Sequence, residues 1–228
     1  LAGGRSTRMG RDKALLDAGG VTLVERLVLA LAPRFERILV STGAEGLSRG
    51  LASTLERAAA AAGRDVAVVE DQREANGPLA GVEAALEEID GSLAFFIAVD
   101  APSVSLELID AMWGEVEASC ATACVPRWSR GLEPAHAVYS KCLLPRVRSL
   151  LDAGERSLQG LASLPAVKVL DLEDPATSRR IFGPSPPDLA ALFLNLNTGP
   201  EYEAWRRELG AGPGMRPPRS SVAKDTEG

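Results

Sequence analysis

Strand-like and helix-like patterns alternate through the first half of this chain. Three short apolar segments typical of buried strands are separated by segments whose apolar residues recur at helical spacing. Parallel strands need a crossover connection, usually a helix, and such crossovers are right-handed. The alternation therefore predicts an α/β fold, a three-layer domain with a mostly parallel sheet. The expected strands are residues 37–41, 66–70 and 93–99, and the expected helices are residues 21–32, 47–62 and 79–89.

The second half of the sequence is less regular but contains the same kinds of segment. Helices are expected at residues 106–118, 140–151, near 158 and at 201–209, and extended segments at 121–126, 133–139, 167–170 and 193–197. Residues 210–228 are rich in Gly, Pro, Arg and Ser and have almost nothing to bury, which predicts a disordered tail. One domain spanning residues 1–209 is therefore expected.

Charge and residue usage exclude several classes of function. A net charge of -6 argues against a general nucleic-acid or membrane surface, and the longest apolar run, residues 93–99, is too short to span a bilayer. Three cysteines without a C-x-x-C pair and a single histidine, His136, are too few for a zinc site. We expect Cys120, Cys124 and Cys142 to be buried, reduced thiols of a cytosolic protein. The lone histidine also argues against a Ser-His-Asp triad.

Residues 1–13 combine features of a phosphate-binding loop. Glycines let backbone N–H groups approach an anion, and nearby cations supply positive charge. The residues concerned are Gly3, Gly4, Arg5, Arg8, Arg11 and Lys13. The spacing excludes a P-loop, because Gly10 is followed by Arg11 rather than lysine, and no G-x-G-x-x-G is present. On these residues alone, an ordinary solvated turn stays an open alternative.

Two acidic residues, Asp71 and Asp100, each follow an expected strand directly. The carboxyl ends of parallel strands face the ligand crevice of open α/β sheets, so both side chains are expected there. Asp100 in VDAP can be a Mg²⁺ ligand or a strand-end cap. Residues 76–81, NGPLAG, can bring the backbone close to a flat base or can simply begin a helix with Pro78 in its first turn.

The full string LAGGRSTRMGRDK resembles the signature loop of the molybdenum cofactor guanylyltransferases, LAGGxSxRMGxDK, and fills every fixed position. These enzymes form a MobA-type nucleotidyltransferase family. Related cytidylyltransferases usually carry Ala-Ala-Gly where this chain has Ala2, Gly3 and Gly4. The strings VDAP, GPLAG, EPAHAVY and NLNT match further family motifs in order, so the resemblance extends from Leu1 to about Trp205.

This chain departs from the family pattern at a few positions. The family often has Cys where this chain has Val99 and Asn where it has Ser41, so a nucleotide contact carries over to Ser41 only weakly. Residues 174–191 look like a lineage-specific insertion. The family signature normally follows a strand, so a first strand is expected upstream of Leu1.

The resemblance implies a Rossmann-like fold and transfer of GMP from GTP to molybdenum-molybdopterin, with release of pyrophosphate. It implies Mg²⁺ as cofactor, with Asp100 as its ligand, and Lys13 and Asp100 as catalytic residues. The nucleotide-binding residues that it implies are Leu1, Ala2, Gly3, Lys13, Ser41, Asp71 and Asp100. Further expectations are a cytoplasmic location, transient contact with molybdoenzymes and cofactor-insertion proteins, and no nucleic-acid or membrane partner.

Alternatives remain for the activity and for three motifs. A related enzyme using CTP or a sugar phosphate, or a non-catalytic GTP-binding accessory protein for molybdoenzymes, would fit many of the same residues. His136 is expected to be a packed histidine rather than a substrate contact. Asn195, Asn197 and Thr198 can either brace the crevice loops through hydrogen bonds or touch substrate.

Overall fold

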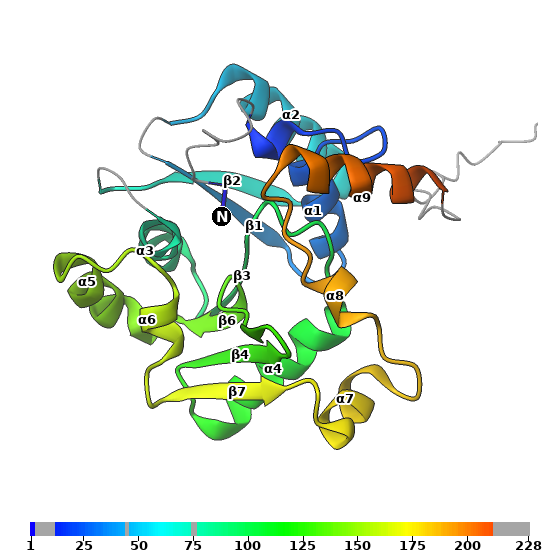
Figure 1. Ribbon diagram of the computed structural model, residues 1–228. Coiled ribbons are helices and arrows are strands. Elements are labelled where there is room, and N and C mark those ends of the chain that lie inside the picture. Colours follow the sequence, from blue (N-terminus) through cyan, green and yellow to red (C-terminus); the bar gives the residue numbers. More distant parts are fainter. Residues whose placement is uncertain (3–11, 44–45, 74–76, 212–228) are drawn as a thin grey trace, which may run out of the picture.

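The computed structural model describes residues 1–2, 12–43, 46–73 and 77–211 (Figure 1). The predicted alternation in the first half is confirmed to within two residues at each boundary. A short 3₁₀ helix, η1 (Lys13–Leu15), precedes it. The alternating elements are α1 (Leu23–Leu31), β1 (Arg37–Thr42), α2 (Arg49–Ala62), β2 (Asp65–Glu70), α3 (Pro78–Glu88) and β3 (Leu93–Ile97).

The second half contains shorter elements. They are α4 (Leu106–Ser119), β4 (Ala123–Trp128), β5 (Gly131–Leu132), β6 (His136–Ser140), the 3₁₀ helix η2 (Lys141–Leu143), α5 (Leu144–Asp152), α6 (Gln159–Ala162), β7 (Val167–Asp171), α7 (Pro175–Phe182), α8 (Leu189–Leu192) and α9 (Gly199–Ala211). Helix α9 runs two residues beyond the expected end of the domain, and the rest of the expected tail, residues 212–228, lies outside the described residues.

Local sequence explains where several helices begin and end. Thr22 and Glu25 form a reciprocal capping box at the start of α1, and Ser48 caps α2. Gly63 ends α2 in the left-handed conformation, with φ of 61°. Pro78 occupies the first turn of α3, where its missing N–H costs nothing.

The strands form two sheets. Strands β1 and β2 pair in parallel, while the second sheet has the order β3-β6-β4-β5 with β7 also pairing with β4. The α/β class is as predicted, but the second sheet is mixed rather than mostly parallel. Its β3–β6, β4–β6 and β4–β5 ladders are antiparallel, and β4–β7 is parallel. Strands β4 and β6 are joined by a short connection through β5. Because a parallel pair would need a long crossover, usually a helix, these two strands run antiparallel.

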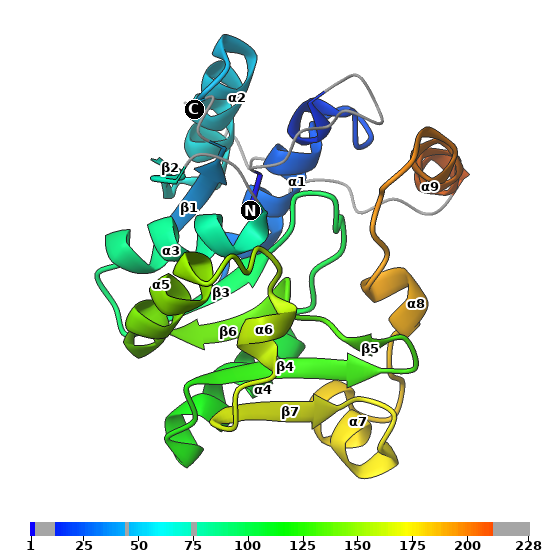
Figure 2. The same cartoon turned by 60° about the vertical axis from the view of Figure 1, so that its left-hand side comes forward.

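Helices cover both faces of the strands and complete three layers. One core cluster unites α1, α2 and α4 with strand residues of both sheets, and another does the same for α3, α5 and α6. In Figure 2, α3, α5 and α6 lie in front of the strands and α4 lies behind them. A smaller cluster packs Tyr202 and Trp205 of α9 against Leu16 and Leu23. No helix in the described ranges is long and apolar enough to cross a membrane.

Two expectations about individual segments are wrong. Residues 193–197 form no strand, because Phe193 ends α8 and Leu196 turns inward, its amide donating to the Asp100 carbonyl (2.8 Å). Cys124 is buried, but Cys120 and Cys142 are exposed. Cys120 ends α4 in a left-handed conformation, and Cys142 belongs to η2, so both are at surface turns. All three thiols are free.

A slot separates the two sheets between β1 and β3. It encloses a cavity of about 260 Å³, lined mainly by apolar residues that include Ile38, Leu39, Ala94 and Phe96. At its upper end Leu1 and Ala2 bridge the two edges through backbone hydrogen bonds. Residues 1–2 therefore link the edge of β1 to the edge of β3.

Candidate functional site

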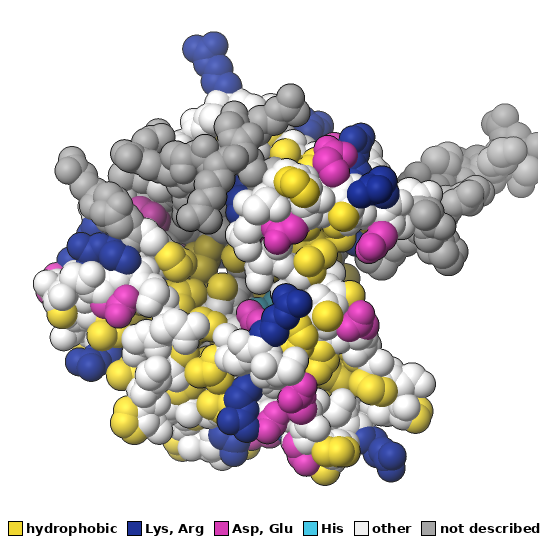
Figure 3. Space-filling view, in the orientation of Figure 1, with side chains coloured by type: hydrophobic (Ala, Val, Ile, Leu, Met, Phe, Trp, Pro, Cys, Tyr) yellow, Lys and Arg dark blue, Asp and Glu magenta, His cyan; other side chains and the backbone are white. Residues whose placement is uncertain are grey.

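The carboxyl ends of β1, β2 and β3 meet at one edge of the molecule, and Leu1 and Ala2 lie between them. The Ala2 amide donates to the Ser41 carbonyl (2.8 Å) on one side. On the other side the Leu1 amine donates to the Ile97 carbonyl (2.7 Å), and the Leu1 carbonyl accepts from the Val99 amide (3.0 Å). Figure 3 shows this region of the surface recessed, with hydrophobic side chains at its floor.

Lys13 and Asp100 meet at this edge, as the sequence predicts for residues that end a signature loop and a strand. The Lys13 Nζ lies 2.7 Å from Asp100 Oδ2, and each side chain is 19% exposed. The Asp12 carboxylate caps η1 by accepting from the Ala14 amide (3.0 Å), which fixes the backbone that carries Lys13. A half-buried cation and carboxylate of this kind can neutralise a phosphate and hold a metal ion.

Asp71 and Ser41 form the neighbouring part of the site. The Ser41 hydroxyl donates to Asp71 Oδ1 (3.1 Å), and burial raises the pKa of Asp71 above its usual value. Ser41 thus links Asp71 to Ala2, while the Val99 amide links the segment before Asp100 to Leu1, so both acidic residues lie at this edge, as their positions after β2 and β3 predict.

Glycines allow the start of α3 to approach this edge. Gly77 has φ of 93°, and a Cβ built on it would lie 2.5 Å from the Arg156 carbonyl oxygen. A Cβ at Gly81 would lie 2.3 Å from Ser41 Oγ and 3.0 Å from Leu1 Cδ2. The backbone at the start of α3 is thus packed against Arg156 at Gly77 and against Ser41 and Leu1 at Gly81.

Asn197 joins Lys13 from the far end of the sequence. Its Oδ1 accepts from Lys13 Nζ (3.2 Å), whereas the Asn195 side chain donates through Nδ2 to the Phe193 carbonyl (3.3 Å). The two asparagines therefore differ, and Asn195 is the one that braces the local backbone.

Glu201 is a site-supporting residue that the sequence analysis missed. Its carboxylate accepts from the backbone amides of Asn197 and Thr198, both at 2.9 Å. The Thr198 side chain and these backbone bonds lower the pKa of Glu201. Thr198 Oγ1 in turn accepts from the Glu201 amide (3.4 Å). The signal was present as Thr-x-x-Glu, the capping-box spacing at the start of a helix.

His136 is packed among aromatic rings. It lies between Phe95 and Phe193, with ring centroids 5.1 and 5.3 Å away and near-perpendicular planes. Neither ring nitrogen has a hydrogen-bond partner among the described residues, and burial lowers the pKa of His136 to about 4. Edge-to-face contact with a phenyl ring is a weak substitute for a hydrogen bond. These contacts agree with the packed histidine expected from the sequence.

Some predicted site residues cannot be placed. Gly3 and the cations Arg5, Arg8 and Arg11 lie outside the described residues, as does Asn76. Among the described residues no group of three or more His, Cys, Asp or Glu side chains comes together. Asp100 instead offers a single carboxylate at an open crevice, and this donor set fits Mg²⁺, which is commonly bound by one or two carboxylates together with substrate phosphates and water.

A family model and individual relatives both show similarity of this chain to nucleotidyltransferases. The family model described as "MobA-like NTP transferase domain" matches residues 1–167. The molybdenum cofactor guanylyltransferase of Syntrophotalea carbinolica is 32% identical over 225 residues, covering 98% of this chain and 96% of the relative. A probable molybdenum cofactor guanylyltransferase of Methanosarcina mazei is 32% identical over 206 residues, covering 89% of this chain and 86% of the relative.

A solved structure shows a similar fold. It is the molybdopterin-guanine dinucleotide biosynthesis protein A of Archaeoglobus fulgidus, with a TM-score of 0.69 and 20% identity. The match covers 92% of this chain and 97% of that chain.

Proposed function

The chain belongs to the MobA-like NTP transferase family, and we propose that it transfers GMP from GTP to the phosphate of molybdenum-molybdopterin, releasing pyrophosphate. The observation that carries this proposal is the meeting of Lys13 and Asp100 beside Leu1, at the carboxyl edge of the strands. That edge is where ligands bind in open α/β folds. The names of the relatives supply the pair of substrates.

The reaction balances without a covalent protein intermediate. A terminal phosphate oxygen of the pterin attacks the α-phosphorus of GTP in line, and the new oxygen–phosphorus bond forms as the bond to the bridging oxygen of the β-phosphate breaks. The bonding electrons leave with pyrophosphate. The protein therefore has to position two anions and to offset the charge on a crowded phosphate centre.

The described residues divide this work between them. Asp100 would hold Mg²⁺, which when bound neutralises phosphate charge and orients the pyrophosphate leaving group. Lys13 is within reach of the same phosphates, because its ammonium already contacts Asp100. Asn197 holds the other side of the Lys13 ammonium and so limits where it can point.

The remainder of the nucleotide would lie along Leu1, Ala2, Ser41 and Asp71, and the sequence resemblance adds Gly3 to these residues. With the phosphates at Lys13 and Asp100, the ribose and base extend toward the Ser41–Asp71 pair and the start of α3. Close packing of Gly81 against Ser41 and Leu1 leaves backbone rather than side chains beside that path.

The test is pyrophosphate release from GTP, CTP and ATP, each with and without molybdenum-molybdopterin. We expect release to require the pterin and to favour GTP by roughly 10³-fold, since a site built for the polar edge of guanine leaves its own groups unpaired with another base. Equal turnover of CTP and GTP would assign the chain to cytidylyl transfer instead. GTP binding without any release would favour the accessory-protein function.

The proposal extends to the cellular setting. We propose a cytoplasmic enzyme whose product passes to molybdoenzymes through transient contact with them or with cofactor-insertion proteins. This extension rests on the sequence resemblance. A pull-down with apo-molybdoenzyme, before and after turnover, tests the contact.

A further inference from the structure

A buried carboxylate outside the proposed reaction centre lies at the middle of an ion-pair cluster. The side chain of Glu83, in the middle of α3, is 6% exposed. Glutamate is almost never buried to this degree unless it is paired. Arg73 contacts both of its oxygens, with Nε–Oε2 at 2.8 Å and Nη2–Oε1 at 3.1 Å, and Arg148 Nε lies 3.4 Å from Oε1.

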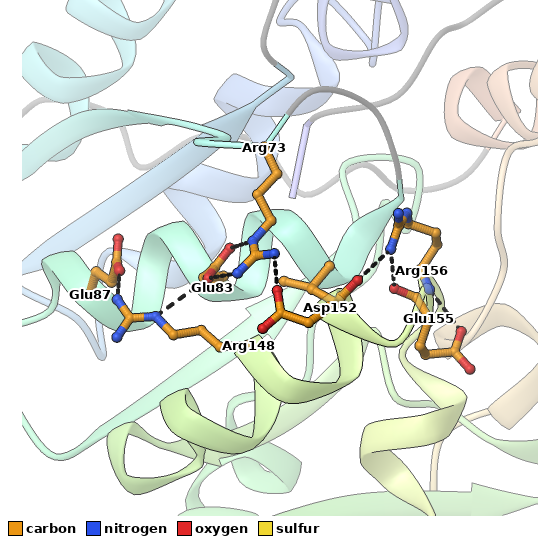
Figure 4. Close-up of polar contacts among 8 residues, drawn as sticks. Arg73, Glu83, Glu87, Arg148, Asp152, Glu155 and Arg156 are labelled. Atoms are coloured by element: carbon orange, nitrogen blue, oxygen red, sulfur yellow. Dashed lines mark hydrogen bonds and ion pairs between the residues drawn. The ribbon is translucent and has the colours of Figure 1, made fainter.

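The cluster ties the segment after β2 to two helices. Arg73 is two residues beyond Asp71, and its Nη1 also contacts Asp152 Oδ1 (2.6 Å) at the end of α5. Arg148, on α5, pairs with Glu87 on α3 as well. Figure 4 shows Arg73 reaching from the segment after β2 to Glu83 and Asp152. These contacts fix the chain just beyond Asp71 against both α3 and α5.

The start of α3 is held from the same direction. The Leu79 amide donates to the Arg156 carbonyl (3.3 Å), and the missing Cβ of Gly77 lets that carbonyl approach. Arg156 itself is held by α5, because its Nη1 donates to the Leu151 carbonyl (2.9 Å). Helix α5 and the loop that follows it thus fix both Arg73 and Gly77.

We propose that Arg73 and Glu83, supported by Arg148 and Asp152, are positioning residues that set the place of Asp71 and of the first turn of α3 for the ribose and base of the nucleotide. This inference rests on the proposed function, in which those two elements flank the base. None of the four residues needs to touch substrate.

The decisive variant is Arg73→Met, because Arg73 is 36% exposed and its loss leaves Arg148 as a partner for Glu83. We expect KM for GTP to rise about tenfold and the preference for GTP over CTP to fall, with kcat within about twofold, as for lost ground-state positioning. Arg73→Lys, which keeps one charge but loses the two-pronged contact, should recover part of the affinity. Combining Arg73→Met with Glu83→Gln should raise KM no further than Arg73→Met alone.

A matched control is Arg57→Met. Arg57 also contacts a nearly buried glutamate, Glu25, through Nε (3.2 Å) and Nη2 (2.9 Å), but it joins α2 to α1. It should lower the melting temperature as Arg73→Met does and leave KM unchanged. If Arg73→Met also lowers stability without moving KM or base preference, the cluster is structural only and the inference is wrong.

Wild-type protein in the same assay separates the two proposals. Absence of pyrophosphate release by the wild type contradicts the proposed function, whereas an active wild type with an unmoved KM in Arg73→Met contradicts the positioning role. Calorimetric titration with GTP covers the inactive case, because a positioning role requires a weaker Kd for Arg73→Met whether or not turnover occurs.

Discussion

Lys13 and Asp100 are charge partners in the free protein. Their contact at 2.7 Å means that both ions are already drawn out of bulk water before any substrate arrives. In the proposed reaction, a phosphate of the nucleotide would take Lys13 as its partner, and Asp100 would be left to hold the metal ion. The unfavourable free energy of desolvating Lys13 and Asp100 therefore arises largely on folding and adds little to the cost of binding.

Asp100→Asn tests the metal assignment at the scale of a single residue. The amide keeps the shape of the carboxylate but not its charge, so turnover should fall by ~10² or more through lost transition-state stabilisation. GTP affinity measured without metal should change little or improve, because a negative charge facing the triphosphate is gone.

The matched control for that variant is Asp171→Asn. Asp171 also pairs with one cation, Arg127 (2.6 Å), but it lies on β7 away from the crevice. It should leave turnover unchanged. Full activity of Asp100→Asn at limiting Mg²⁺ would contradict the metal role.

His136 makes stability depend on pH. Its pKa is about 4 in the folded protein and 6.5 in the unfolded chain, so the unfolded state binds more protons between these values. The contribution of His136 to the free energy of unfolding should be complete above about pH 6.5. It should be lost as the pH drops toward 4, by on the order of 3 kcal/mol. Urea unfolding of the wild type and of His136→Leu across that range measures the effect. Identical slopes for the two proteins would show that other groups set the pH dependence.

At the scale of elements, the sequence best predicts the helices and strands whose boundaries depend on contacts between residues close in sequence. The alternating half follows from periodicity and caps, such as Thr22 with Glu25 and Gly63 at the end of α2. The expected extended segment at residues 193–197 is instead a loop, in which Phe193 and Leu196, three positions apart, are the buried residues. Sheet pairing partners are not encoded in local pattern, and the antiparallel course of β6 followed from a short connection.

The candidate site was predictable to a similar degree. Lys13, Asp71 and Asp100 were expected together, because each follows or precedes a strand end at one edge of a sheet. The Lys13–Asn197 contact joins residues 184 positions apart, and no spacing rule predicts it. The Arg73–Glu83 pair was also missed, since a glutamate within a helix is ordinarily taken for an exposed residue.

Gly77→Ala tests how closely the start of α3 must meet the loop after α5. Its φ of 93° is unfavourable for alanine, and the new Cβ would lie 2.5 Å from a backbone oxygen that cannot rotate away. Unfolding free energy should fall by about 2 kcal/mol or more. Gly183→Ala is the control, because Gly183 also has a positive φ with extended ψ (74° and −151°) but nothing within 4 Å of the added atom. Equal losses from the two variants, measured by chemical denaturation, would show that the contact with Arg156 does not matter.

At the scale of the whole molecule, the slot between β1 and β3 is a cavity of about 260 Å³ among the described residues. Two facing strand edges and an apolar lining are what an extended segment needs from its surroundings, and Leu1 and Ala2 already pair with both edges. We propose that an extended segment preceding Leu1 occupies the slot and unites the two sheets.

Extending the chain tests this proposal. A segment of about five apolar, β-branched residues placed before Leu1, similar in length to β3, should raise the melting temperature by at least about 5 °C. It should also slow amide exchange in β1 and β3. A Gly-Ser extension of equal length is the control. The same melting temperature with both extensions would exclude a strand in the slot.

The position of that slot gives the substrate a mechanical role. Ser41 in β1 and Asp71 after β2 lie on one side of it, and Asp100 follows the strand on the other. A nucleotide that reached from Asp100 to Asp71, as proposed above, would link the two groups of strands across this slot. Its binding free energy would add to the stability of the fold, as for any ligand that binds only the folded state. The nucleotide-bound and free proteins should thus differ in the mobility of β1 and β3 at the slot more than in the overall arrangement of the fold.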